Sequence, residues 1–188
     1  MKCELPGTTL AGTEESYQNA FGTLEPVLSA TKGLTLSQLH ELTGLAGSTI
    51  QNWVKRGWVA NPTTRRYGEC QVVRVILINM LRNSLKLEKI ISLMSYINGS
   101  VEDRGDDIIE DRELWNILCS VIFSARKAET TDCDSIRIII GEKLEGYCGP
   151  SEDSNEKLFG ALLCMTLAYI SSEIKKEAEE ELDNIIKA

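Results

Sequence analysis

The sequence predicts an all-α protein in which a compact unit of short helices is followed by an α-helical C-terminal domain. Apolar residues recur at spacings of three and four through most of the 188 residues, which is the period of an amphipathic helix. Helix-start and helix-stop signals then divide the first hundred residues into short elements. We expect three segments: an N-terminal arm (1–31), a short-helix unit (32–100) and an acidic helical domain (101–188).

The N-terminal segment carries the weakest signals. Residues 1–13 are expected to form a loose arm. A weak helix fits within 14–30, interrupted by Gly22 and Pro26. Alternatively, Pro26 is the first residue of a short helix, since proline is favoured at that position.

The clearest helix start in the chain lies at Thr35. Thr35 is followed three residues later by Gln38, and this spacing is a capping box that predicts a helix from Leu36. Gly44 ends the helix, because glycine tolerates the left-handed conformation of a C-terminal cap. The residues expected on the inward face are Leu36, Leu39 and Leu42.

A second helix follows after a glycine-containing turn. Ser48 or Thr49 is expected to cap it, Gly57 to stop it, and Leu45 to fill the angle between the two helices. Its inward residues are Ile50, Trp53 and Val54. Two short helices joined by such a turn form a helix-turn-helix, whose second helix lies in the DNA major groove.

The remaining segments are predicted to be helical. Residues 69–83 are apolar on nearly every side, which indicates a buried central helix from which Arg74 and Arg82 reach outward. Further amphipathic helices are expected at about 85–97, 111–128, 134–145 and 153–186. The stretch 101–111 is an acidic connector. It lacks the EF-hand pattern of a calcium site, so a solvated linker is the simpler interpretation.

Charge is distributed unevenly along a chain whose net charge is −8. Residues 32–100 hold nine basic and three acidic side chains, whereas residues 101–188 hold ten basic and twenty-one acidic ones. Such asymmetry is typical of a basic binding module joined to an acidic one. The alternative is chance combined with a solvated acidic surface.

Several function classes find no support in the sequence. No apolar run approaches the roughly 18 residues of a membrane span, and no secretory signal begins the chain, so we expect a cytoplasmic protein. No nucleotide-binding, hydrolase or metalloprotease motif is present. We therefore expect neither an enzyme nor a cofactor.

The cysteines and the one histidine point to no metal site. The six cysteines are Cys3, Cys70, Cys119, Cys133, Cys148 and Cys164. None forms the close pair that zinc modules need. Cys119 and Cys164 are interpreted as buried, while a redox or thiolate-metal role is the alternative for Cys133 and Cys148 near loop ends. His40 is expected at or near the surface.

The order of these elements resembles the winged DNA-binding domain of MerR-type regulators. The residues that carry the resemblance are Thr49-Ile50, Lys55-Arg56-Gly57-Trp58-Val59 and Pro62. It implies that the 61–67 loop, which ends in Arg65-Arg66-Tyr67, is a wing.

A second resemblance is more specific. The segments GLTLSQLHELTGLAGSTIQNWVKRGW, RRY, ILINMLRNSL and ISLMSYING are similar, in that order, to an uncharacterised bacterial family, domain-of-unknown-function family 1836. It covers about residues 32–112. It implies a helix-turn-helix protein acting in transcription, but no ligand or operator.

We therefore expect a sequence-specific transcriptional regulator that binds double-stranded DNA, with the second helix (48–56) in the major groove. Glutamine and asparagine can pair with adenine edges, and arginines on the wing can hold phosphates. The expected DNA-binding residues are Ser48, Thr49, Gln51, Asn52, Lys55, Arg56, Arg65, Arg66 and Tyr67.

Two further expectations concern partners. Small helix-turn-helix units commonly act as dimers. The apolar stripe of the final helix also continues beyond the length that one small domain needs to complete its core. This predicts a homodimer through residues 101–188, while the sequence leaves any small-molecule effector undefined. The alternative function is a protein–protein interaction module with Trp53 and Trp58 as anchors.

Overall fold

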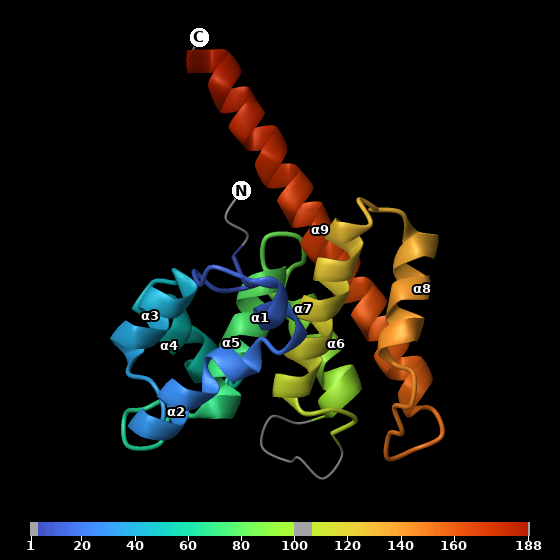
Figure 1. Ribbon diagram of the computed structural model, residues 1–188. Coiled ribbons are helices and arrows are strands. Elements are labelled where there is room, and N and C mark those ends of the chain that lie inside the picture. The colour runs from blue at the N-terminus through green and yellow to red at the C-terminus, as the bar shows by residue number, and fades with distance from the viewer. Residues whose placement is uncertain (1–3, 100–106, 188) are drawn as a thin grey trace.

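The computed structural model describes residues 4–99 and 107–187 and shows an all-α protein (Figure 1). Among the described residues, only isolated β-bridges accompany the helices. The helices are α1 (Glu14–Gln18), a 3-10 turn η1 (Phe21–Thr23), α2 (Glu25–Thr31), α3 (Leu36–Thr43), α4 (Gly47–Lys55), α5 (Glu69–Leu81), α6 (Leu87–Asn98), α7 (Asp111–Lys127), α8 (Cys133–Lys143) and α9 (Ser154–Lys187).

Helix α5 is the buried central helix that its apolar sequence predicts. Every residue from Val72 to Ile78 is buried, and α3, α6, α7 and α9 pack around it. The expectation that Arg74 reaches outward is wrong. Arg74 is only 5% exposed, and its Nη1 lies 3.5 Å from Asp111 Oδ1. A charge at this depth is retained because it has a partner on the neighbouring helix α7.

The N-terminal segment is not a loose arm where the structure describes it. Leu5 is 1% exposed, and the backbone N–H of Thr9 donates to the carbonyl of Leu42 at 2.8 Å. Gly7 (φ +80°) lies so close to Ile76 that a Cβ would collide with the Ile76 carbonyl. Glycine is therefore required there, and the segment forms part of the wall around α5. The short helix that Pro26 predicts is α2, with proline in its first turn.

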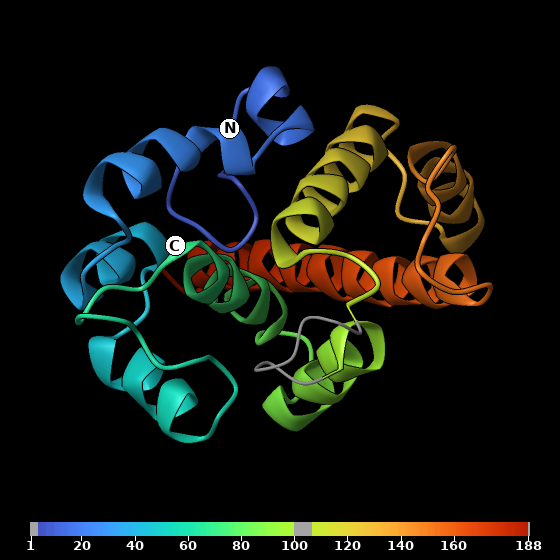
Figure 2. The same ribbon diagram turned by 90° about the horizontal axis from the view of Figure 1, so that it is seen from below.

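Helix α9 is the longest element and has two different halves. Seen from below, its first half runs between the α5/α6 pair and the α7/α8 pair (Figure 2). That half is buried at Leu158, Leu162 and Met165. By length and hydropathy, α9 is the one helix among the described residues that could cross a membrane. Its apolar half is packed in the protein core, which accounts for the hydropathy.

The segments 1–31, 32–100 and 101–188 share one hydrophobic core, which runs from Leu5 to Tyr169. Specific bonds also join them: the indole Nε1 of Trp115 donates to the Pro6 carbonyl at 3.0 Å, and Ser84 Oγ donates to the Ala168 carbonyl at 2.6 Å. The basic and acidic parts of the chain are therefore packed against each other. Residues 101–106 of the predicted acidic connector lie outside the described residues.

The cysteines divide into buried and accessible thiols. Cys119 is fully buried, and desolvation raises the pKa of its thiol well above the usual range. Cys133 and Cys148 are exposed. Cys164, expected to be buried, is exposed on α9 because it lies on the side of the helix away from the core. Cys3 lies outside the described residues, among which no group of metal-ligating side chains gathers.

Candidate nucleic-acid interface

The candidate interface is built on α4, which presents two chemically different faces. Ile50 is fully buried and Trp53 is 2% exposed, so these residues fix the inward face. The opposite face consists of exposed polar side chains, with Thr49 half-buried at its edge. The exposed residues are Ser48, Gln51, Asn52 and Lys55. Packing of the apolar stripe therefore forces the predicted polar residues outward.

The orientation of α4 is set by the turn that precedes it. The capping box of Thr35 and the left-handed Gly44 (φ +69°) begin and end α3 as predicted. Leu45 is 2% exposed and fills the angle between α3 and α4. Ser48 and Thr49 do not cap α4: the N-cap is Ala46, whose carbonyl accepts from the N–H of Thr49 at 2.9 Å.

Close packing explains why α4 begins earlier than its polar residues suggest. Gly47 starts the helix, and a Cβ there would lie 3.2 Å from a methyl group of Leu36. The absence of a side chain lets the first turn of α4 approach α3 closely. As a result, Ser48 belongs to the exposed first turn of the helix.

The predicted wing is a tight turn anchored to the start of α3. Thr64 (φ +52°) and Arg65 (φ +63°) are both left-handed, and the N–H of Arg66 donates to the Thr63 carbonyl at 2.9 Å. Two successive positive φ angles are typical of a type I′ hairpin turn. At its base, Tyr67 and Leu34 exchange backbone hydrogen bonds of 2.8 and 2.9 Å.

The structure separates the three wing residues that the sequence grouped together. Arg65 is exposed at the tip of the turn. Arg66 is half-buried, and its Nη1 donates to the Gly33 carbonyl at 2.9 Å, so it holds the wing against the body. Tyr67 is 4% exposed, and burial raises its pKa. A contact with an external ligand is therefore open to Arg65, whereas Tyr67 is a core residue.

The two tryptophans also differ in accessibility. Trp53 belongs to the core, so it is not available as a surface anchor for a protein partner. Trp58 is half-buried, with the Arg56 guanidinium 4.9 Å from the centre of its ring. This cation–π contact fixes the exposed Arg56 beside the C-terminal end of α4.

One basic residue near the wing was not singled out from the sequence. Lys32 is exposed and left-handed (φ +52°) at the C-terminal cap of α2. It directly precedes Gly33, whose carbonyl accepts from Arg66. The pairing of Leu34 with Tyr67 joins segments more than thirty residues apart, and no local sequence signal predicts such pairing.

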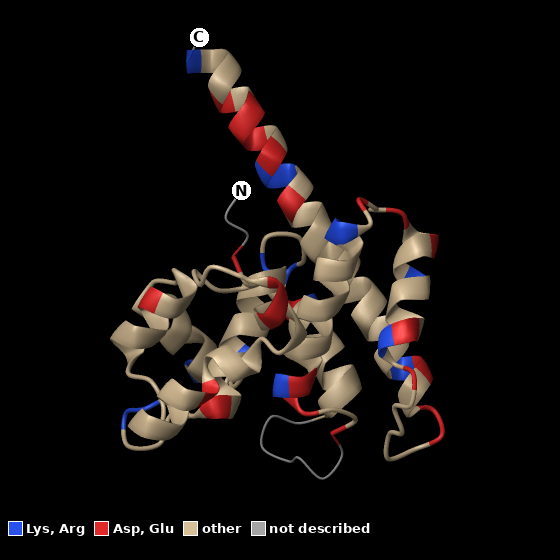
Figure 3. Ribbon diagram, viewed as in Figure 1, with Lys and Arg blue, Asp and Glu red and all other residues tan. Residues whose placement is uncertain are grey.

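The surface formed by α4 and the wing has one sign of charge. Between Glu41 and Glu69 the sequence contains no acidic residue and four basic ones. Figure 3 shows basic residues on the wing loop and acidic residues along the far half of α9. Exposed amide and hydroxyl groups beside positive charge suit a polyanion with hydrogen-bonding edges.

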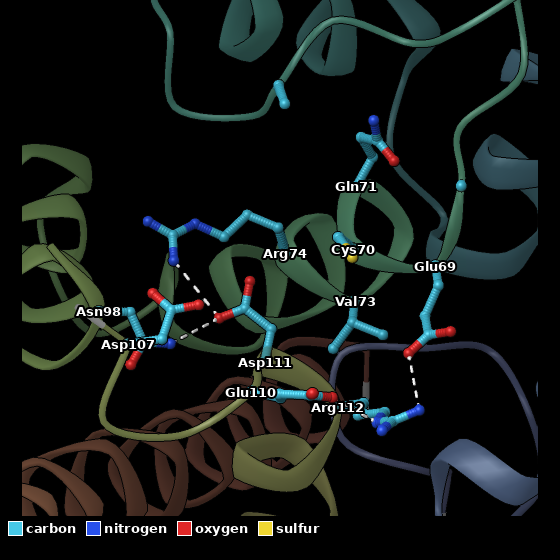
Figure 4. A pocket seen from close by; sticks show the side chains of 12 residues that line it. Glu69, Cys70, Gln71, Val73, Arg74, Asn98, Asp107, Glu110, Asp111 and Arg112 are labelled. Atoms are coloured by element: carbon cyan, nitrogen blue, oxygen red, sulfur yellow. Dashed lines mark hydrogen bonds and ion pairs between the residues drawn. The ribbon is translucent and has the colours of Figure 1, made fainter. Parts of the chain in front are cut away.

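A cavity of about 270 Å³ opens behind the wing, between α5, the end of α6 and the start of α7 (Figure 4). Its charged groups bond to one another. Arg112 Nε lies 2.7 Å from Glu110, and Arg112 Nη1 lies 3.4 Å from Glu69. We interpret the Arg112–Glu69 and Arg74–Asp111 pairs as structural links between α5 and α7, whereas the Arg112–Glu110 pair lies within the start of α7.

Comparison with known proteins gives one family match and one relative. Residues 25–117 match the profile of a domain of unknown function, DUF1836, as the sequence resemblance predicted. The matched residues run from α2 into α7. The uncharacterized protein YkrK of Bacillus subtilis (strain 168) is 31% identical over 86 residues, which is 44% of this chain. The match covers 37% of YkrK, little more than a third of that protein. No solved structure matches significantly.

Proposed function

We propose that this protein is a sequence-specific DNA-binding transcriptional regulator that acts in the cytoplasm. In this proposal α3 and α4 form a helix-turn-helix, and the 61–67 loop is a MerR-like wing. The observation that carries the proposal is the outward face of α4. There, Gln51, Asn52 and Lys55 are exposed, and no carboxylate occurs in the sequence between Glu41 and Glu69.

The proposed mode of recognition follows from the two faces of α4. The major groove of B-DNA is wide enough to admit a helix, and it displays donor and acceptor patterns that differ between base pairs. Gln51 and Asn52 are adjacent on the exposed face, and each can pair with both edge atoms of an adenine. The buried Ile50 and Trp53 fix α4 against the core. The helix backbone therefore needs no reordering when Gln51 and Asn52 bind the bases.

The positive residues around α4 are assigned to the DNA backbone. In this assignment Lys55 and Arg56 contact phosphates at the end of α4, and Arg65 and Lys32 contact the flanking phosphates beside the wing. Such contacts fix the register of the helix but carry no sequence information themselves. The acidic surface of the chain has to face away from the duplex.

A salt titration of the full-length protein on duplex DNA tests the phosphate assignment. Four phosphate contacts per chain predict that log K falls against log salt with a slope of about −3 to −4 when one chain binds, and about −7 when two chains bind together. Fluorescence anisotropy of a labelled duplex measures that slope. Affinity that does not depend on salt, or an absence of binding at low salt, contradicts the proposal.

The two wing arginines are expected to act differently. Arg65→Ala removes an exposed charge and should flatten the salt slope by about one unit without changing the melting temperature. Arg66→Ala removes the bond to the Gly33 carbonyl and should lower the melting temperature. Anisotropy and thermal unfolding on both variants measure this contrast. An unchanged salt slope for Arg65→Ala would exclude a phosphate contact at the wing tip.

A further inference from the structure

The second half of α9 extends beyond the body of the protein (Figure 1). Its residues from Ile174 to Lys187 are exposed, although several are large and apolar. The exposed fractions are 51% for Ile174, 54% for Leu182, 72% for Ile185 and 73% for Ile186. Most helices in proteins owe their stability to packing of an apolar face. In this half of α9 that face has no partner among the described residues.

Apart from Ile186, the exposed apolar residues belong to one long outer face of α9. Successive residues on this face are three or four positions apart, which is the spacing found where two helices pair along their length. They are Gly160, Cys164, Leu167, Ser171, Ile174, Ala178, Leu182 and Ile185. The first four lie over the body, where Gly160, Cys164 and Ser171 are exposed and small. Ser171 is the nearest of these small residues to the extended half, so the end of a second helix can reach the edge of the body at this position.

Charge along the extended half identifies a second copy of the chain as the partner. Lys175 and Lys176 lie next to the body, and a carboxylate-rich stretch follows from Glu177 to Asp183 (Figure 3). Parallel pairing would place like charges beside each other along the whole length. Antiparallel pairing places the lysines of one copy at the height of the carboxylates of the other, which is favourable.

The same charges disfavour a lipid surface as the partner. From Glu173 to Lys187 the helix carries six carboxylates and three lysines. Helices that lie on membranes are typically rich in lysine and arginine on the polar face, because they meet anionic lipids. In this half of α9 acidic side chains outnumber basic ones.

We infer that two copies of this protein associate through the outer faces of their α9 helices, which pair antiparallel about a two-fold axis near Ala178. In this arrangement Ile174 of one copy lies at the height of Leu182 of the other. The contact is isologous, as two-fold contacts between identical chains are. The inference stands independently of DNA binding, since it rests on α9 alone.

The first experiment places a charge in the seam of the full-length protein. Leu182→Glu should raise the dimer dissociation constant at least 10-fold, an order typical of a central interface residue. Its matched control is Ile138→Glu on α8, where the isoleucine is 65% exposed and lies outside the seam. Sedimentation equilibrium without DNA measures association, and circular dichroism checks that both variants keep their helices.

The outcomes of this experiment are distinct. Wild type and Ile138→Glu should be dimers, whereas Leu182→Glu should be a folded monomer at the same concentration. A monomeric wild-type protein overturns the inference, as does a Leu182→Glu variant that dimerises as tightly as wild type. A monomer that binds vesicles of anionic lipid would show that a membrane covers this face instead.

Cysteine cross-linking tests the antiparallel direction. The parent carries serine in place of every cysteine except the buried Cys119, namely Cys3, Cys70, Cys133, Cys148 and Cys164, and it should not cross-link under mild oxidation. Ala178→Cys in this parent should form a disulfide dimer, because the two residues meet near the axis. Ile185→Cys should not, because at 1.5 Å per residue the two copies lie about 20 Å apart along the pair. Equally fast cross-linking at both positions would show parallel pairing.

Discussion

Trp115→Ala should lower the free energy of unfolding by about 3–5 kcal/mol, the usual cost of truncating a buried aromatic side chain to alanine. Trp115 is fully buried on α7, and its indole donates to the Pro6 carbonyl. The variant keeps Trp53 and Trp58, which report on the α3–α4 unit. One core links the α3–α4 unit to the C-terminal helices. The fluorescence of Trp53 and Trp58 should therefore change at the same urea concentration as the far-ultraviolet circular dichroism.

The control for this prediction is an exposed aromatic residue. Tyr96 on α6 is 56% exposed, so Tyr96→Ala should change the free energy of unfolding by no more than about 0.5 kcal/mol. The informative result is the urea midpoint at which the fluorescence of Trp53 and Trp58 changes in the Trp115→Ala variant. If that transition stayed at the wild-type midpoint, the two halves would be independent domains, contrary to the shared core.

Asn52→Ala should weaken binding to the preferred DNA sequence by about 1–3 kcal/mol, which is the discrimination of one paired adenine contact. Binding to unrelated duplexes should stay the same, since the amide is assigned to a base edge. Gln51→Ala should act in the same way at a neighbouring base pair. Both side chains are exposed, so thermal unfolding should not change. Anisotropy on matched and mismatched duplexes separates the two contributions.

The control for the base-reading residues is Lys55 on the same face. Lys55→Ala should weaken binding to all duplexes alike, because a phosphate contact is independent of sequence. If Asn52→Ala behaved like Lys55→Ala, with equal losses on preferred and random DNA, its side chain would not read bases.

Local signals in the sequence predicted much of the α3–α4 unit. The capping box at Thr35, the left-handed Gly44 and the apolar residue in the turn are all confirmed. Each depends on residues within a few positions of one another, so the sequence alone can specify it. The start of α4 was misplaced because Gly47 serves a packing contact with Leu36 that the sequence does not show.

Features that depend on distant segments could not be predicted. Arg74 meets its partner on α7, and Arg66 meets the Gly33 carbonyl across a loop. Residues 1–13 were expected to form a loose arm because they carry only weak signals, yet the described part of this segment is fixed by tertiary bonds to α3, α5 and α7. Composition cannot show which of these groups meet in space.

The apolar stripe of α9 shows the same limit within a single helix. The sequence suggested one continuous face from Phe159 to Ile185. The residues up to Tyr169 pack toward the core. Ile174 and Leu182 are exposed because the second half of α9 extends beyond the body (Figure 1), and the sequence does not show where the body ends.

The most direct test of the account is selection of bound duplexes from a random DNA pool by the full-length protein. We expect enrichment of one short motif that contains adenine at the positions assigned to Gln51 and Asn52. Repeating the selection with Asn52→Ala should relax one of those positions. A wild-type pool with no enrichment over the starting sequences, measured at a salt concentration where the protein binds DNA, would contradict sequence-specific recognition by α4.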